Sequence, residues 1–108
     1  WIDKSKEKAL VSSADTVRQS VTTEIVEYYK DGKKINGAQT SEVYDSDFWD
    51  KASDLAGTKL QCTDSKKAGY VTFTIVKNSM TEFSYSDGTR TAVYDSNNST
   101  WDVKDTAK

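Results

Sequence analysis

Histidine and proline are absent from this chain of 108 residues, which holds one cysteine and one methionine. Without histidine, the commonest general base and transition-metal ligand is missing, so no Ser-His-Asp or Cys-His catalytic set can be assembled. A single cysteine excludes an intrachain disulfide, a Cys-x-x-Cys pair and a zinc cluster. The five glycines fall singly at turns, which leaves no glycine-rich phosphate loop. We therefore expect no enzyme activity and no cofactor.

Charge of one sign and long apolar runs are also lacking. Fifteen basic residues against 17 acidic ones give a net charge of −2, so we expect no nucleic-acid partner. No apolar run approaches the 18 or more residues that a membrane span needs. Because the chain begins at Trp1 and not at Met, we expect it to be the soluble part of a longer protein. Its length fits one domain, residues 1–108.

A long helix is predicted over residues 1–30. Residues 2–30 contain no glycine, and their apolar positions recur every three or four residues, as on one face of a helix. The positions predicted to pack this helix against a sheet are Leu10, Ala14, Val17, Val21 and Ile25. Asp31-Gly32 ends the helix. Its polar first turn leaves two alternatives open: Ser5 caps a helix that begins there, or the helix is already under way at Trp1.

A loop with a short helix is predicted over residues 31–57. Asp31-Gly32 and Asn36-Gly37 are turn signals. Asp45 or Ser46 can cap a helix that ends at Gly57. The face of this second helix that we expect to be packed consists of Phe48, Trp49, Ala52, Leu55 and Ala56.

Residues 58–108 are predicted to form a β-sheet, because their apolar pattern has a period of two. Asp87-Gly88 is a hairpin signal. The predicted strands of the meander are 70–77, 80–86, 89–95 and 100–104, and residues 59–63 are a candidate short strand before them. Links this short require antiparallel pairing. The fold class is therefore α+β, a long N-terminal helix packed on an antiparallel meander of three or four strands, with a short second helix in the connecting loop.

One segment carries oxygen ligands at alternate positions, as calcium loops do. It contains Asp95, Asn97 and Ser99 but lacks the glycine at the sixth position and the glutamate at the twelfth that define an EF-hand. A hairpin turn explains the same residues, so both interpretations stay open, and no metal site is predicted beyond these calcium candidates. Most aromatic residues are expected in the core or in cross-strand pairs, with Trp1 as the exception.

The polar, lysine-rich start of the helix (residues 1–10) followed by an amphipathic stretch of small residues (11–21) resembles the membrane-distal half of the N-terminal helix in type IV pilins. The order of long helix, loop and meander is similar to the globular head of that family. The chain departs from the family's pattern in two ways: the apolar N-terminal segment with its acidic residue is missing, and a lone Cys62 cannot form the C-terminal disulfide. Lysine-rich heads without a disulfide look more like pilins of Gram-positive anaerobes.

The resemblance implies a structural subunit of a type IV pilus, an extracellular cell-surface filament for adhesion and twitching motility. Its partners would be other copies of itself or related pilins, and it would meet the membrane only through the absent N-terminal segment. The residues that would face neighbouring subunits are Trp1, Lys4, Lys6 and Lys8. Two alternatives stay open: a pseudopilin of a type II secretion-like system, and an extracellular binding or inhibitor module of the cystatin-like kind.

Overall fold

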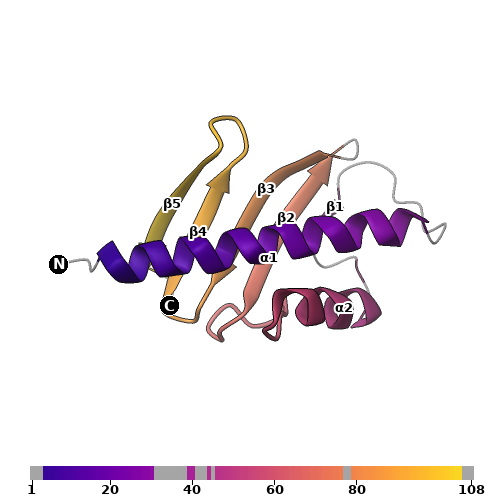
Figure 1. Cartoon of the computed structure of the whole chain (residues 1–108), viewed down its shortest axis with the longest axis horizontal. Coiled ribbons are helices and arrows are strands. Elements are labelled where there is room, and N and C mark those ends of the chain that lie inside the picture. Colours follow the sequence, from indigo (N-terminus) through magenta and orange to yellow (C-terminus); the bar gives the residue numbers. More distant parts are fainter. Residues whose placement is uncertain (1–3, 31–38, 41–43, 45, 77–78, 106–108) are drawn as a thin grey trace.

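A computed structural model describes residues 4–30, 39–40, 44, 46–76 and 79–105. Helix α1 (Lys4–Lys30) crosses one face of a sheet, from β5 at its N-terminal end towards β1 at its C-terminal end (Figure 1). Helix α2 (Ser46–Ala56) lies beside the C-terminal half of α1. The strands are β1 (Gln39–Thr40), β2 (Tyr70–Val76), β3 (Ser79–Ser86), β4 (Arg90–Asp95) and β5 (Thr100–Asp105). This confirms the predicted α+β class.

The five strands pair in chain order, and every pairing is antiparallel. The register aligns one row of aromatic side chains across four strands, in the order Phe73, Phe83, Tyr94 and Trp101. Side chains in this row point towards the helices, because Phe73 and Phe83 are buried. The next position along each strand turns to the other face, where polar residues such as Thr72 and Ser84 share a hydroxyl hydrogen bond.

Helix α1 buries the stripe that its sequence period predicts. All five predicted packing positions, from Leu10 to Ile25, belong to one core cluster with residues of the sheet and of α2. At about 1.5 Å per residue, the 27 residues of α1 span about 40 Å. The molecule measures 48 × 27 × 23 Å, so the helix runs along most of its longest dimension. Ser5 lies inside α1, and Trp1 lies outside the described residues.

The predicted sheet boundary at residue 58 is wrong. Residues 59–63 form no strand, and the segment meets the sheet only through an isolated parallel bridge from Gln61 to Tyr70. The Gln61 side chain folds this segment into a turn, because its Oε1 accepts hydrogen bonds from the backbone N–H groups of Thr63 (2.8 Å) and Asp64 (2.7 Å). A glycine is needed where the loop closes: a Cβ at Gly69 would lie 2.1 Å from the Lys59 carbonyl oxygen.

Two further differences concern the connecting segment. Strand β1 pairs Gln39 and Thr40 with β2, which adds a two-residue strand to the predicted meander. In α2, Phe48, Trp49 and Ala52 are buried, but Leu55 is 53% exposed, so its predicted place on the packed face is wrong. Leu55 lies in the last turn of α2, at the margin of the buried face, where neither α1 nor the sheet covers it.

Candidate functional site

The most distinctive surface is the exposed side of α1, opposite its buried stripe. Between residues 9 and 26, every exposed position on α1 carries an uncharged side chain. We call these eight residues the α1 crest: Ala9, Ser12, Ser13, Thr16, Gln19, Thr22, Thr23 and Val26. Three residues in ten of the whole chain are charged, so an uncharged strip this long differs from the rest of the surface.

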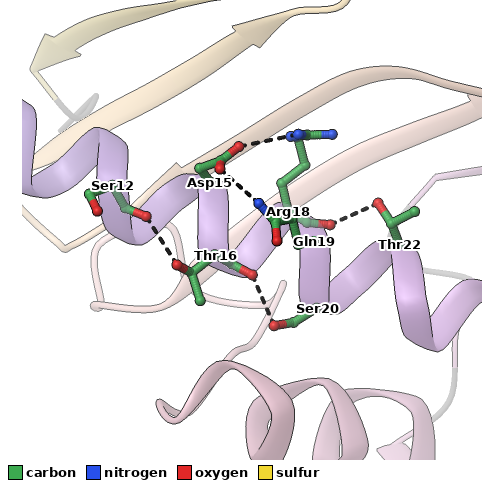
Figure 2. A network of polar contacts seen from close by, with 7 residues as sticks. All are labelled: Ser12, Asp15, Thr16, Arg18, Gln19, Ser20 and Thr22. Carbon is green, nitrogen blue, oxygen red and sulfur yellow. Dashed lines mark hydrogen bonds and ion pairs between the residues drawn. The ribbon is translucent and has the colours of Figure 1, made fainter.

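Hydroxyl groups of the α1 crest are turned back onto the helix backbone (Figure 2). The hydroxyls of Thr16, Thr22 and Thr23 each donate a hydrogen bond to the carbonyl oxygen four residues earlier, at 3.2, 2.8 and 2.9 Å. At the edge of the crest, the buried Ser20 makes the same bond to the Thr16 carbonyl oxygen at 2.9 Å. Because these donors are already satisfied within the helix, covering them with another surface leaves no donor unpaired. Covering Thr16, Thr22 and Thr23 therefore costs little for polar residues.

Two charged residues next to the crest, Asp15 and Arg18, interact with other groups of the protein. Asp15 accepts hydrogen bonds from Arg18 (3.2 Å) and from the Gln19 side chain (2.9 Å), as Figure 2 shows. The Arg18 guanidinium carbon lies 4.6 Å from the centre of the Tyr94 ring on β4. A cation over an aromatic face is attracted to it, so Arg18 is held against the sheet.

Of the four residues predicted to contact neighbouring subunits, Lys8 is the one whose side chain the structure describes. Lys8 is exposed, at the N-terminal end of the crest. Lys4 and Lys6 belong to the first turn of α1, but their side chains, like the whole of Trp1, lie outside the described residues. The crest continues along the helix from Lys8, and the sequence pattern alone does not single out its residues as subunit contacts.

An open groove of about 970 Å³ runs between the N-terminal half of α1 and strand β5. Its lining combines an apolar floor with charged walls, formed by Glu7, Lys8, Val11, Ser12, Asp15 and residues 99–103. Trp101 contributes to this floor and is half-buried, with its ring centre 4.9 Å from that of Tyr94 and 6.1 Å from that of Phe83. The ring is thus fixed by its aromatic neighbours.

A smaller pocket of about 390 Å³ lies on the other flank of α1. It is lined by uncharged residues, most with a hydroxyl group: Ser12, Ser13, Thr16, Val17, Ala56, Thr58 and Tyr85. Burial, with a smaller effect from Asp87, raises the pKa of the Tyr85 phenol above its usual value of 10.0. Tyr85 therefore keeps its proton at neutral pH and offers a hydroxyl rather than a charge.

The calcium candidates lie in the turn between β4 and β5. There the Asp95 carboxylate accepts hydrogen bonds from the Asn97 and Asn98 backbone N–H groups (2.9 and 3.3 Å) and from the Asn98 side chain (2.8 Å). Ser99 takes a left-handed conformation with φ of 55°. Both oxygens of Asp95 thus organise the hairpin turn. Among the described residues, no group of three or more His, Cys, Asp or Glu side chains could hold a metal ion.

The Asp95 turn carries a pH-dependent prediction. The Asn98 side chain, with the two backbone N–H groups, holds the pKa of Asp95 below its usual value of 3.8. The carboxylate therefore stabilises the fold above that unfolded-state pKa, and the contribution is lost as the pH falls through the lower folded-state pKa. We expect Asp95→Asn to melt below wild type at neutral pH and the two melting temperatures to converge in acid.

Circular dichroism melts from neutral pH to about pH 2 measure this convergence, across the range in which carboxylates titrate. Asp50→Asn, a change at an exposed α2 position, is the matched control, and its difference from wild type should not follow the same course. A melting-temperature difference for Asp95→Asn that stays constant over the whole pH range would contradict the assigned role of the carboxylate.

Comparison with known proteins found no match for this chain: no family model, curated protein or solved structure matches it. No helix in the described part of the chain is long and apolar enough to cross a membrane.

Proposed function

We propose that this chain is the head of a filament subunit similar to the type IV pilins, and that it assembles with copies of itself or with related subunits through α1. The α1 crest carries this proposal. A helix that runs along most of the molecule while exposing an uncharged strip, with its three threonine hydroxyls hydrogen-bonded within the helix, is suited to packing against neighbouring subunits. From Ala9 to Val26 the strip extends about 26 Å, at about 1.5 Å per residue.

Burial of the crest would follow the general pattern of protein interfaces. Charged residues are depleted at the centre of an interface, and a polar rim surrounds it. Here Lys8 stands near one end of the crest, and the ion pair between Glu27 and Lys30 (3.5 Å) stands at the other. In the proposed filament the uncharged strip is covered, and these charged ends set the register between subunits. The filament would lie outside the cell, with the sheet and α2 on its surface.

Placing a charge in the middle of the crest tests the proposal. We expect Thr23→Lys to reduce the filaments sheared from cells of the source organism at least about tenfold, because a buried unpaired charge is costly. The purified head should keep its melting temperature within a few degrees, since Thr23 is exposed and lysine is the better helix former. Filament yield is measured by immunoblotting the sheared fraction with an antibody against the head.

Thr89→Lys is the matched control, because it makes the same change at an exposed position in the β3–β4 hairpin, away from α1. Its filament yield should equal that of wild type. Wild-type yield from Thr23→Lys would reject the crest as the assembly surface. Absence of the chain from the sheared filaments would reject the filament function altogether.

A further inference from the structure

The smaller pocket on the flank of α1 gathers hydroxyl groups that the head itself leaves unpaired. The side chains that bring a hydroxyl to it are Ser12, Ser13, Thr16, Thr58 and Tyr85. The Thr16 hydroxyl bonds to the Ser12 carbonyl oxygen. The other four hydroxyls make no hydrogen bond within the described part of the chain. We call this site the hydroxyl pocket.

Tyr85 is the residue that the sheet contributes to the hydroxyl pocket. Its neighbours across the strands are Val71 and Ala92, both fully buried, so its side chain points towards the helices. Tyr85 is only 7% exposed, and its hydroxyl has no partner among the described residues. Buried polar side chains normally have a hydrogen-bond partner, so an unpaired phenol that borders a pocket indicates that a partner comes from outside the head.

The hydroxyl pocket suits a neutral group. Among the described residues that line it, none is charged. Burial raises the pKa of the Tyr85 phenol, so this group also stays neutral at neutral pH. An ion would lose its hydration here without gaining a counter-charge, which is costly. Hydroxyl groups both donate and accept hydrogen bonds, so they match an amide or another hydroxyl.

The hydroxyl pocket is continuous with the α1 crest, because Ser12, Ser13 and Thr16 belong to both. A surface that covers this half of the crest therefore covers the pocket as well. Covering the crest threonines leaves no donor unpaired, but covering the free hydroxyls of the pocket does so unless the partner supplies hydrogen-bonding groups. The partner must therefore bring polar groups to this one point.

We propose that the hydroxyl pocket receives an uncharged polar side chain, an amide or a hydroxyl, from the neighbouring copy of the chain, and that the Tyr85 hydroxyl binds it. This inference rests on the proposed assembly through α1 and adds the point at which two subunits recognise each other. The rest of the crest needs only a surface that fits, whereas the pocket needs matching groups. Tyr85 is thus a specificity residue of the subunit contact.

Tyr85→Phe tests the inference, because it removes the hydroxyl and keeps the ring. The purified variant should melt at or above the temperature of wild type, since the hydroxyl has no partner within the head. We expect the yield of sheared filaments to fall about three- to tenfold, because each subunit contact loses one buried hydrogen bond. Tyr70→Phe is the matched control: this half-buried tyrosine lies on the other face of the sheet, and its variant should give wild-type yield.

Thiol labelling measures whether the hydroxyl pocket is covered in the filament. In a Cys62→Ser background, Thr58→Cys places a thiol at the exposed edge of the pocket. We expect a maleimide to label it at least about tenfold more slowly in sheared filaments than in the purified head, because interface centres exclude water. Thr89→Cys, exposed in the β3–β4 hairpin, should react at the same rate in both.

Three results would overturn this inference and leave assembly through the crest in place. The first is wild-type filament yield from Tyr85→Phe while Thr23→Lys removes filaments. The second is a melting temperature of Tyr85→Phe well below wild type, which would mean that the head itself uses the hydroxyl. The third is equal labelling of Thr58→Cys in filaments and head, which would leave the pocket open to a soluble ligand. Absence of the wild-type chain from sheared filaments is a different result and would overturn the proposed function together with this inference.

Discussion

Substitution of Val21 by aspartate is expected to destabilise the domain strongly. Val21 is fully buried (0% exposed) in the middle of α1, within the core cluster shared with the sheet. A carboxylate there has no place for a counter-ion, and leaving a buried charge uncompensated costs about 3 to 5 kcal/mol. Domains of this size are stable by only about 5 to 15 kcal/mol. Circular dichroism should therefore show a melting temperature at least about 15 °C below that of wild type.

Thr23→Asp controls for helix propensity and for the added charge, because Thr23 lies two residues further on and is exposed. Its melting temperature should stay within a few degrees of wild type. If Val21→Asp and Thr23→Asp melt together, α1 does not present the described face to the sheet, and the crest would have to be reassigned as well.

The regular elements could be predicted because their local signals agree with their tertiary surroundings. Spacings of three and four residues from Leu10 to Ile25 predict the buried face of α1, and the structure buries all five positions. Asp87-Gly88 predicts the β3–β4 hairpin, in which the Asp87 side chain accepts hydrogen bonds from the Thr89 and Arg90 N–H groups, both at 2.8 Å. Both signals depend only on residues close in sequence, so no knowledge of the fold is needed to interpret them.

The predictions are wrong where the local structure depends on contacts with residues that are distant in the sequence or on side-chain hydrogen bonds. Lys59–Thr63 has the composition of a short strand, but the Gln61 side chain takes the nearby N–H groups and folds the segment into a turn. Strand β1 forms because Gln39 and Thr40 pair with the end of β2. Two residues are too few to show an alternating pattern in the sequence, so this strand could not be predicted. The exposure of Leu55 depends on how far α1 extends over α2, which is a property of packing rather than of helical period.

Of the two candidate surfaces, the crest could be predicted from the sequence and the groove could not. The uncharged composition of the α1 crest is visible in the sequence, because it is the complement of the predicted buried stripe. The groove joins residues near 7–15 to residues 99–103, so it follows only from the strand order that places β5 beneath the start of α1. The sequence allows Asp95 to be either a calcium ligand or a turn residue, and its three hydrogen bonds to Asn97 and Asn98 show the second role.

Removing the Phe48 ring is the second change expected to have a large effect. Phe48 is 1% exposed and lies at the centre of the aromatic cluster that attaches α2. Its ring centre lies 4.4 Å from that of Tyr44, 5.3 Å from Trp49 and 6.2 Å from Phe73 on β2. Phe48→Ala deletes these contacts and leaves a cavity, so we expect the free energy of unfolding to fall by about 3 to 5 kcal/mol.

Two further variants separate loss of packing from loss of the α2 helix itself. Phe48→Leu keeps most of the buried volume and should cost less than about 1.5 kcal/mol. Leu55→Ala removes an exposed side chain from the same helix and should change the free energy of unfolding by less than about 0.5 kcal/mol. Urea unfolding followed by tryptophan fluorescence measures all three. Equal effects of Phe48→Ala and Leu55→Ala would mean that α2 contributes through its own helicity, and that the aromatic cluster does not hold it to the sheet.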